Sequence, residues 1–257
     1  VGKTTTVVNL GTALASIDKK VLILDVDPQY NSSLSFNRYN HELSIYKALS
    51  GEKKLKDLIQ ETQIPNLKII SACEDLAAAE YELASDENRN FIIKEQLDQI
   101  KEEYDYIFID TPPTLGLLTI SALAASDEVL IPVQCEFFAL EGLSKLVKTI
   151  DMIKENLNTN LKINGIVLTM YDKRNSLSAL IEDEARKYFD TVVYKFNVPR
   201  NVKLSEAPSH GLPAIIYDLN CAGSQAYIGL AREFIERNKQ WKTKNLEWGY
   251  HHYLVQK

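Results

Sequence analysis

VGKTTTVVNLGTAL, residues 1–14, is the stretch that decides the fold. Its Gly2-Lys3-Thr4-Thr5 run is the second half of a phosphate-binding loop, whose full pattern has another glycine and four free positions before Gly-Lys-Thr. Good helix formers follow, so Gly2 and Lys3 are expected at a helix N-terminus. There the free backbone N–H groups and the helix dipole favour a phosphate. Taken alone, the stretch is equally well explained as a chance match at a helix start.

Three aspartates further along the chain favour the phosphate-binding interpretation. VLILDVDPQYN places Asp25 and Asp27 after an apolar strand, and YDYIFIDTPPT places Asp110 in the same way. Ligands of open parallel sheets bind just outside the carboxyl ends of the strands. A carboxylate at such a strand end suits Mg²⁺, directly or through a water, although each aspartate alone could be a helix cap or a turn residue. Together with Lys3 and Thr4, they predict a magnesium–nucleotide site.

The hydrophobic pattern predicts an α/β fold with a doubly wound, mostly parallel sheet and helices on both faces, because apolar runs of strand length alternate with helical periods. The expected strands are Val21–Asp25, Leu67–Ile70, Tyr106–Asp110, Val129–Val133, Ile163–Thr169 and Thr191–Tyr194. The expected helices are Lys3–Ile17, Glu87–Glu102, Thr114–Ala125, Ala139–Asn156, Ser176–Phe189 and Ala222–Asn238. Residues 1–238 are expected to form a single domain, and residues 239–257 a weakly ordered tail.

Composition restricts the remaining possibilities. The 257 residues are 45% hydrophobic and carry a formal net charge of −6, so binding to nucleic acid would need a local basic patch rather than bulk charge. The cysteines and histidines show neither a disulfide framework nor metal-ligand spacing, which favours a reducing cytoplasm. They are Cys73, Cys135, Cys221, His41, His210, His251 and His252.

The motifs together resemble the ATPases with a deviant Walker A motif, and within them the ParA/Soj partition proteins. The resemblance rests on Gly2-Lys3-Thr4-Thr5, Asp25-Val26-Asp27-Pro28-Gln29 and Ile109-Asp110-Thr111-Pro112-Pro113. Two further stretches make it specific: LTMYDKRNSLS (168–178) and VPRNVKLSEAPSHGLPAIIYD (198–218), the latter followed by CAGSQAYIGLAREFIER. It covers residues 1–238 and implies a P-loop ATPase fold, ATP and Mg²⁺ as cofactors, and hydrolysis of ATP to ADP and phosphate.

The resemblance also implies roles for individual residues. Lys3 and Asp27 would be catalytic, with Asp27 orienting the attacking water. Thr4, Asp25 and Asp110 would serve the magnesium ion. The nucleotide would be held by Gly2, Lys3, Thr4, Thr5, Met170, Pro199 and Pro208.

Members of the family bind DNA non-specifically as an ATP-dependent homodimer, and a ParB-type DNA-binding protein stimulates their hydrolysis. The implied DNA contacts here are Lys173, Arg174, Arg200 and Lys203, each in a loop after an expected strand. The implied function is segregation of a chromosome or plasmid, and the implied location is the cytoplasm, on the nucleoid.

The start of the sequence departs from the family pattern. The family's loop reads Lys-Gly-Gly-x-Gly-Lys-Thr-Thr, and this sequence begins at the free position, Val1. The signature lysine that reaches the partner's nucleotide, two glycines and the first strand of the sheet are therefore expected to be missing, with that strand's place next to the Asp110 strand. A fragment lacking these parts is one alternative, since it need not turn over ATP.

A second alternative is a MinD-like membrane-associated ATPase for placement of the division site, which shares the nucleotide motifs. It requires a basic amphipathic helix at the C-terminus. Trp241, Lys242, Lys244, Leu246 and Trp248 suit one in composition, but Gly249 interrupts the segment, so membrane binding is disfavoured. An iron–sulfur reductase is disfavoured, because residues 111–128 contain no cysteine.

Overall fold

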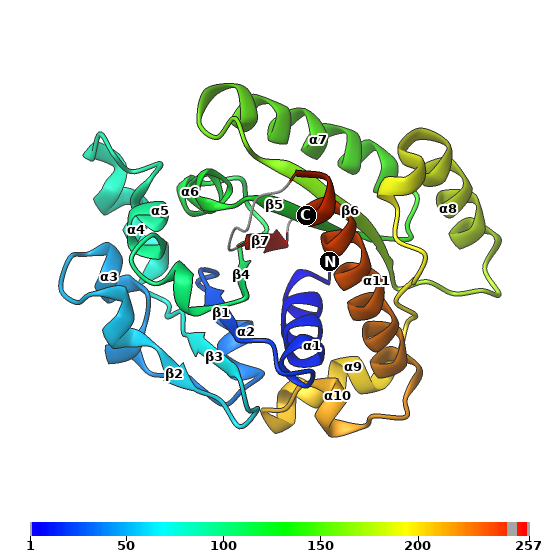
Figure 1. The fold of residues 1–257 in the computed structure, drawn as a ribbon, viewed down its shortest axis with the longest axis horizontal. Helices are drawn as coiled ribbons and strands as arrows, with labels where there is room; N and C mark the ends of the chain where they lie inside the picture. The colour runs from blue at the N-terminus through cyan, green and yellow to red at the C-terminus, as the bar shows by residue number, and fades with distance from the viewer. Residues whose placement is uncertain (1, 246–250, 256–257) are drawn as a thin grey trace.

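The computed structural model describes residues 2–245 and 251–255 of the chain. Within these residues, seven strands form one sheet in the order β2-β3-β1-β4-β7-β5-β6 (Figure 1). All neighbouring strands run parallel except β2 and β3. The strands are β1 (Val21–Asp25), β2 (Gln60–Glu61), β3 (Leu67–Ile70), β4 (Tyr106–Asp110), β5 (Glu128–Gln134), β6 (Lys162–Thr169) and β7 (His251–Val255). The predicted α/β class with a mostly parallel sheet is confirmed.

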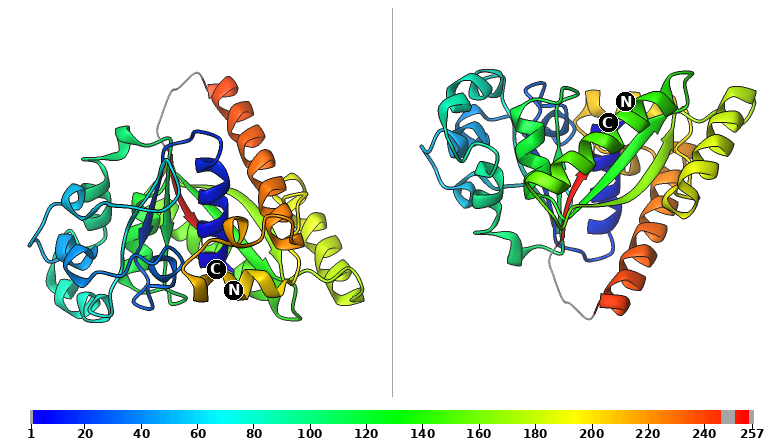
Figure 2. Two further views of the ribbon diagram at one scale, coloured as in Figure 1. Left: turned by 90° about the horizontal axis from the view of Figure 1, so that it is seen from below. Right: turned by 90° about the horizontal axis from the view of Figure 1, so that it is seen from above.

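Helices cover both faces of the sheet, as Figure 2 shows from two sides. The α-helices are α1 (Lys3–Ala15), α2 (Asn31–Leu34), α3 (Tyr46–Leu49), α4 (Leu76–Glu82), α5 (Ile92–Leu97), α6 (Leu117–Ala125), α7 (Ala139–Asn156), α8 (Ser176–Phe189), α9 (Val202–Glu206), α10 (Ala214–Tyr217) and α11 (Ala222–Asn245). The short 3-10 helices are η1 (His41–Leu43), η2 (Leu55–Leu58), η3 (Leu83–Ser85), η4 (Lys101–Glu103), η5 (Asp190–Val192) and η6 (Ala207–His210).

Two hydrophobic clusters, one on each face, hold the layers together. Along β1, Val21 and Ile23 pack into the cluster that includes residues of α1 and α11. Their neighbours Leu22 and Leu24 point the other way, into the cluster that includes residues of α5, α6 and α7. Because both faces are covered, β1 and β4 are buried along their whole length and read as continuous apolar runs. Among the described residues, no helix is long and apolar enough to cross a membrane.

Two predicted elements differ from the structure. Residues 191–194 form no strand: η5 ends at Val192, and only Val193 makes an isolated bridge, to Ile166. The Tyr194 N–H donates to the Ile166 carbonyl at 2.8 Å, and the Tyr194 ring lies where a side chain at Gly165 would have to be, so the segment touches the edge of β6 without continuing as a strand. The helix expected over Glu87–Glu102 covers only Ile92–Leu97, and a separate 3-10 helix follows at Lys101–Glu103. It starts late because Asn88 donates its backbone N–H to the Asp86 carboxylate in a turn.

The C-terminal segment differs most from expectation. We expected a weakly ordered tail after residue 238, but α11 continues to Asn245 and residues 251–255 form β7. β7 lies between β4 and β5, parallel to both, as an internal strand of the sheet (Figure 1). The place beside β4, expected to be empty in this chain, is therefore filled. Without β7, two central strands would expose unpaired backbone N–H and C=O groups.

An aromatic cluster anchors β7. Tyr253 is fully buried, and its ring centroid lies 4.8 Å from that of Phe234 on α11, 5.6 Å from Phe108 and 5.8 Å from Tyr106, both on β4. Such centroid separations are favourable for aromatic pairs. The tail residues considered for a membrane helix, from Trp241 to Trp248, have side chains outside the described part of the structure.

Candidate functional site

The candidate site lies where the carboxyl ends of β1 and β4 meet the N-terminus of α1. Asp25 and Asp110 are register partners at the ends of these neighbouring parallel strands. Helix α1 begins at Lys3, whose charge interacts with the carboxylates of Asp110 and Asp27. The parallel sheet therefore brings together residues that are more than a hundred positions apart in the sequence.

Gly2 sets up the start of α1. Its φ of 96° lies in the left-handed region, where a side chain is strained, and its carbonyl accepts from the Thr6 N–H at 2.9 Å. The first backbone N–H groups of a helix have no intrahelical partner, so those that follow Gly2 are available to an anion. The backbone therefore requires a glycine at Gly2, next to the position where the sequence predicts that an anion binds.

Lys3 is almost completely buried and points back over the end of β4. Its Nζ donates to the carbonyl of Pro112 at 2.8 Å. Burial lowers the pKa of Lys3, although the nearby carboxylates of Asp110 and Asp27 partly oppose this. A buried ammonium held by a single carbonyl can exchange that carbonyl for an anionic oxygen.

Asp110 has one oxygen engaged and one open. Its Oδ2 accepts from the Ser32 hydroxyl at 2.7 Å, while its buried Oδ1 finds no hydrogen-bond partner among the described residues. Burial raises the pKa of Asp110 to about 6, and hydrogen bonding by Ser32 and Thr4 and the charge of Lys3 partly offset it. An orphaned carboxylate oxygen beside the Thr4 hydroxyl is a donor set that suits Mg²⁺, which prefers oxygen ligands.

Asp25 is held differently. Its Oδ1 accepts from the Asp27 N–H at 3.2 Å, and its Oδ2 accepts from both the N–H and the hydroxyl of Ser33, at 2.9 and 2.7 Å. Burial, together with the neighbouring Asp110, raises its pKa well above the usual range. Asp25 therefore ties the 27–33 loop to the strand end. Its oxygens, unlike Oδ1 of Asp110, are already used by the protein.

Asp27 faces a cavity of about 640 Å³ at the mouth of the site. Its Oδ1 accepts from the Gln29 N–H at 2.9 Å, which fixes the carboxylate at the start of the loop. Six predicted site residues line this cavity: Gly2, Lys3, Thr4, Thr5, Asp27 and Pro208.

A second cavity of about 1130 Å³ adjoins the first, and Ser205 lines both. Met170 and Pro199, predicted on the adenine side of a nucleotide, line the second cavity rather than the one that holds Lys3. The structure thus separates these two residues from Pro208, which the sequence motif had grouped with them.

The predicted DNA contacts fall into two kinds. Arg174 forms two hydrogen bonds with the Asp172 carboxylate, at 3.0 and 2.9 Å, and this pairing lowers the pKa of Asp172 to about 2. Lys203 forms an ion pair with Glu206 at 2.9 Å. Lys173 and Arg200 are exposed on the rim of the second cavity, and neither forms an ion pair within the described part of the chain.

Sequence reasoning missed several residues of the site. Ser32 and Ser33 hold Asp110 and Asp25, and Lys195 joins Lys173 and Arg200 around the second cavity. The serines lie in NSSLS, directly after the Asp25–Gln29 motif, so their position in the chain was the available signal. Nothing in the sequence near Lys195 marks it.

Comparison with known proteins identifies the family. Residues 1–163 match the profile of a family described as an AAA domain. The chain is 47% identical to the chromosome partitioning protein ParA of Caulobacter vibrioides over 248 residues, which cover 95% of this chain and 93% of the relative. It is 50% identical to the sporulation initiation inhibitor protein Soj of Bacillus subtilis over 235 residues, 91% of this chain and 93% of the relative.

A solved structure with the same fold holds a nucleotide. Cobyrinic acid a,c-diamide synthase from Mycobacterium smegmatis, with a bound ATP analogue and magnesium, superposes with a TM-score of 0.80 at 28% identity. The match covers 95% of this chain and 92% of the other. Given the extent of identity to ParA and Soj over nearly the whole chain, and the agreement of the strand-end carboxylates with the sequence motifs, this chain belongs to the ParA/Soj family of partitioning ATPases.

Proposed function

We propose that this protein is a DNA-partitioning ATPase that dimerises with ATP, binds DNA non-specifically and hydrolyses ATP when a ParB-type partner stimulates it. ATP and Mg²⁺ are the cofactors of this fold, as the nucleotide complexes of its structural neighbours show. One observation carries the proposal: Lys3, Thr4 and Asp27 line one cavity, and Asp110, which has an unused buried oxygen, interacts with Thr4 and Lys3.

Each residue has a distinct task in this proposal. The backbone N–H groups after Gly2 and the ammonium of Lys3 bind the phosphates, with Lys3 giving up the Pro112 carbonyl that it now contacts. Thr4 and Asp110 would hold the magnesium ion, which would neutralise phosphate charge. Asp25 keeps Ser33 and Asp27 in place, and Asp27 orients the water for attack. Bound Mg-ATP supplies the phosphoryl group for transfer to water, a reaction in which positioning and charge neutralisation provide most of the acceleration.

DNA binding would rest on the rim of the second cavity. Lys173 and Arg200 are exposed and outside any ion pair among the described residues, so their charge is available to phosphates. Arg174 and Lys203 would first have to leave Asp172 and Glu206. We therefore rank Lys173 and Arg200 above the other two. Association with the nucleoid in the cytoplasm would follow from this binding.

The nucleotide proposal is tested with two variants and a control. Lys3→Ala should lose affinity for a fluorescent ATP analogue, whereas Asp27→Ala should keep that affinity and lose hydrolysis, measured as phosphate release. Asp57→Ala, at an exposed position of η2, should change neither. Unchanged nucleotide affinity in Lys3→Ala would contradict the proposed site.

The DNA proposal is tested by retardation of plasmid DNA with Mg-ATP over a range of salt concentrations. Arg200→Ala should weaken binding uniformly across sequences and reduce the slope of log affinity against log salt by about 1. Lys187→Ala is the matched control, because Lys187 is an exposed α8 cation paired with Glu184 on another part of the surface. Equal loss in both variants would show that only overall charge matters.

Partner stimulation is tested separately. Addition of a ParB-type protein, or of its basic N-terminal segment, should raise phosphate release by the parent protein and leave Asp27→Ala inactive. Dimerisation should appear in sedimentation with the non-hydrolysed analogue and be absent with ADP. A rate that does not respond to the partner would refute this part of the proposal without affecting nucleotide binding.

A further inference from the structure

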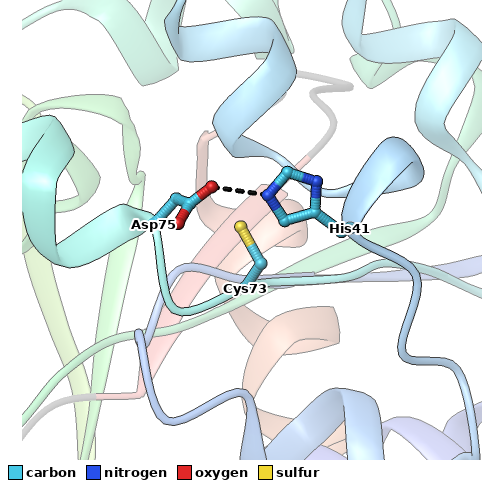
Figure 3. Close-up of side chains that lie close together, drawn as sticks. All are labelled: His41, Cys73 and Asp75. Atoms are coloured by element: carbon cyan, nitrogen blue, oxygen red, sulfur yellow. Dashed lines mark hydrogen bonds and ion pairs between the residues drawn. The ribbon is translucent and has the colours of Figure 1, made fainter.

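Three metal-ligating side chains from two separate segments meet beside the C-terminal end of β3. His41 begins η1, whereas Cys73 and Asp75 lie in the turn between β3 and α4. Their ligand atoms, an imidazole nitrogen, Sγ and a carboxylate oxygen, all lie within 4.8 Å of one another. Figure 3 shows the His41 ring and the Asp75 carboxylate facing each other, with the Cys73 sulfur pointing toward the gap between them.

The donor set suits one class of ion. Nitrogen, thiolate sulfur and carboxylate oxygen together are ligands of Zn²⁺ and related divalent transition metals, whereas Mg²⁺ and Ca²⁺ take oxygen. Bonds of about 2.0–2.3 Å in tetrahedral geometry place ligand atoms roughly 3.3–3.7 Å apart. The His41 Nε2–Asp75 Oδ2 separation of 2.5 Å would open by about 0.8 Å, and the other ligand separations, which are all within 4.8 Å, would settle into the same range.

Burial gives the cluster a closed inner side and an open outer side. Cys73 is fully buried, so its sulfur forms the floor. The His41 and Asp75 side chains are 41% and 44% exposed, which leaves a path for an ion from solvent and room for a water as fourth ligand. Three protein ligands and one open position is a common zinc arrangement.

Neighbouring groups already orient the ligands. The second ring nitrogen of His41, Nδ1, lies 3.6 Å from the Glu42 carboxylate, and metal-bound histidines usually direct their other nitrogen to such an acceptor. Ser44 donates its hydroxyl to the His41 carbonyl at 2.8 Å and holds the backbone of η1. The two segments are joined by the Ile45 N–H, which donates to the Ser71 carbonyl at 2.8 Å.

We propose that His41, Cys73 and Asp75 form a binding site for a single divalent transition metal ion of the zinc class. The ion replaces the proton now shared between His41 and Asp75 and binds the Cys73 thiolate, whose proton leaves to solvent. None of the three residues lines the cavity that contains Lys3, so this site is separate from the nucleotide site. It links η1 to the turn after β3.

The test uses Co²⁺ as the probe, with the nucleotide-free protein reduced by a phosphine at pH 8. Cobalt bound to a thiolate gives a charge-transfer absorption in the near ultraviolet, which an oxygen-ligated cobalt at the magnesium site does not give. We expect this band to saturate at one equivalent and to disappear on addition of Zn²⁺. Cys73→Ser should abolish it, and His41→Gln and Asp75→Asn should each weaken cobalt binding at least tenfold.

Matched controls remove a thiol and an imidazole elsewhere. Cys221→Ser and His210→Gln should leave the band unchanged, and Glu42→Gln should weaken binding about 10–100-fold while keeping the band. Because Cys73 is buried, its variant could unfold. Circular dichroism checks this, and the exposed variants His41→Gln and Asp75→Asn then decide the question. Absence of the band in the parent protein, its survival in Cys73→Ser, or undiminished binding in both exposed variants would overturn the proposal.

Discussion

Replacing Asp110 by asparagine should stabilise the nucleotide-free protein while removing its response to magnesium. Burial raises the pKa of this carboxyl from 3.8 to about 6, so ionising it costs more in the folded than in the unfolded chain. At about 1.4 kcal/mol for each pH unit, the cost is about 3 kcal/mol above pH 6. Asparagine has nearly the same shape and no charge. Its new amide N–H groups lack full hydrogen bonding, so we expect a net gain of about 1–3 kcal/mol.

The pH dependence has a defined sign. Between about pH 4 and pH 6 the folded protein binds more protons at Asp110 than the unfolded chain does, so the parent's free energy of unfolding falls as the pH rises through this window. Asp25, its register partner, contributes in the same direction because its pKa is also raised. Asp110→Asn should flatten this fall, so that its advantage over the parent is small at pH 4 and full at pH 8.

Urea unfolding in EDTA at a series of pH values measures these differences. The same variant, titrated with a fluorescent ATP analogue, should lose the part of its affinity that depends on Mg²⁺. Asp98→Asn is the control, because Asp98 is partly exposed and paired with Lys101, and its change should stay within about 0.5 kcal/mol. An Asp110→Asn protein less stable than the parent at pH 8, or a difference that does not vary with pH, would refute the reasoning.

Three further predictions test other parts of the structure. Tyr253→Ala should lower the free energy of unfolding by about 3–5 kcal/mol, measured by thermal or urea unfolding, because it empties the aromatic cluster. Tyr81→Ala, at a side chain that is 85% exposed, should be neutral. A small effect of Tyr253→Ala, like that of Tyr81→Ala, would contradict the position of β7 in the sheet. Ser33→Ala should lower the free energy of unfolding by about 2–3 kcal/mol, because the Asp25 carboxyl and the buried Ala72 N–H each lose a hydrogen-bond partner. A urea midpoint like the parent's would contradict this. Gly2→Ala should weaken ATP-analogue binding by straining a φ of 96°, and unchanged affinity would argue against a rigid loop start.

Much of the sheet could be predicted because its strands are buried on both faces. Val21–Asp25, Leu67–Ile70 and Tyr106–Asp110 were predicted with the bounds that the structure shows, since a continuous apolar run ending in a polar residue is a strong local signal. Residues 191–194 are similarly apolar but form only an isolated bridge beside β6, between Val193 and Ile166, while the Tyr194 ring packs over Gly165. This packing depends on residues distant in the sequence, which a local apolar pattern does not show.

The candidate site could likewise be predicted from the sequence only in part. Lys3, Thr4, Asp27 and Asp110 could be found because each stands at a helix start or strand end with a recognisable neighbour sequence. That Asp110 keeps an unused oxygen whereas both oxygens of Asp25 are taken could not be found in this way. It depends on where Ser33 lies.

The sequence by itself determined the α/β class, the main strands and the phosphate-binding start of α1, because these depend on periodicity and on residues close together in the chain. Only the tertiary structure decided the sheet order and the side-chain pairings that follow from it. Residues 251–255 contain too short an apolar run to indicate a strand, and they form one because β4 and β5 offer two unpaired edges. His41 and Cys73 are 32 positions apart and show no metal spacing, and they meet only because η1 packs against the turn after β3.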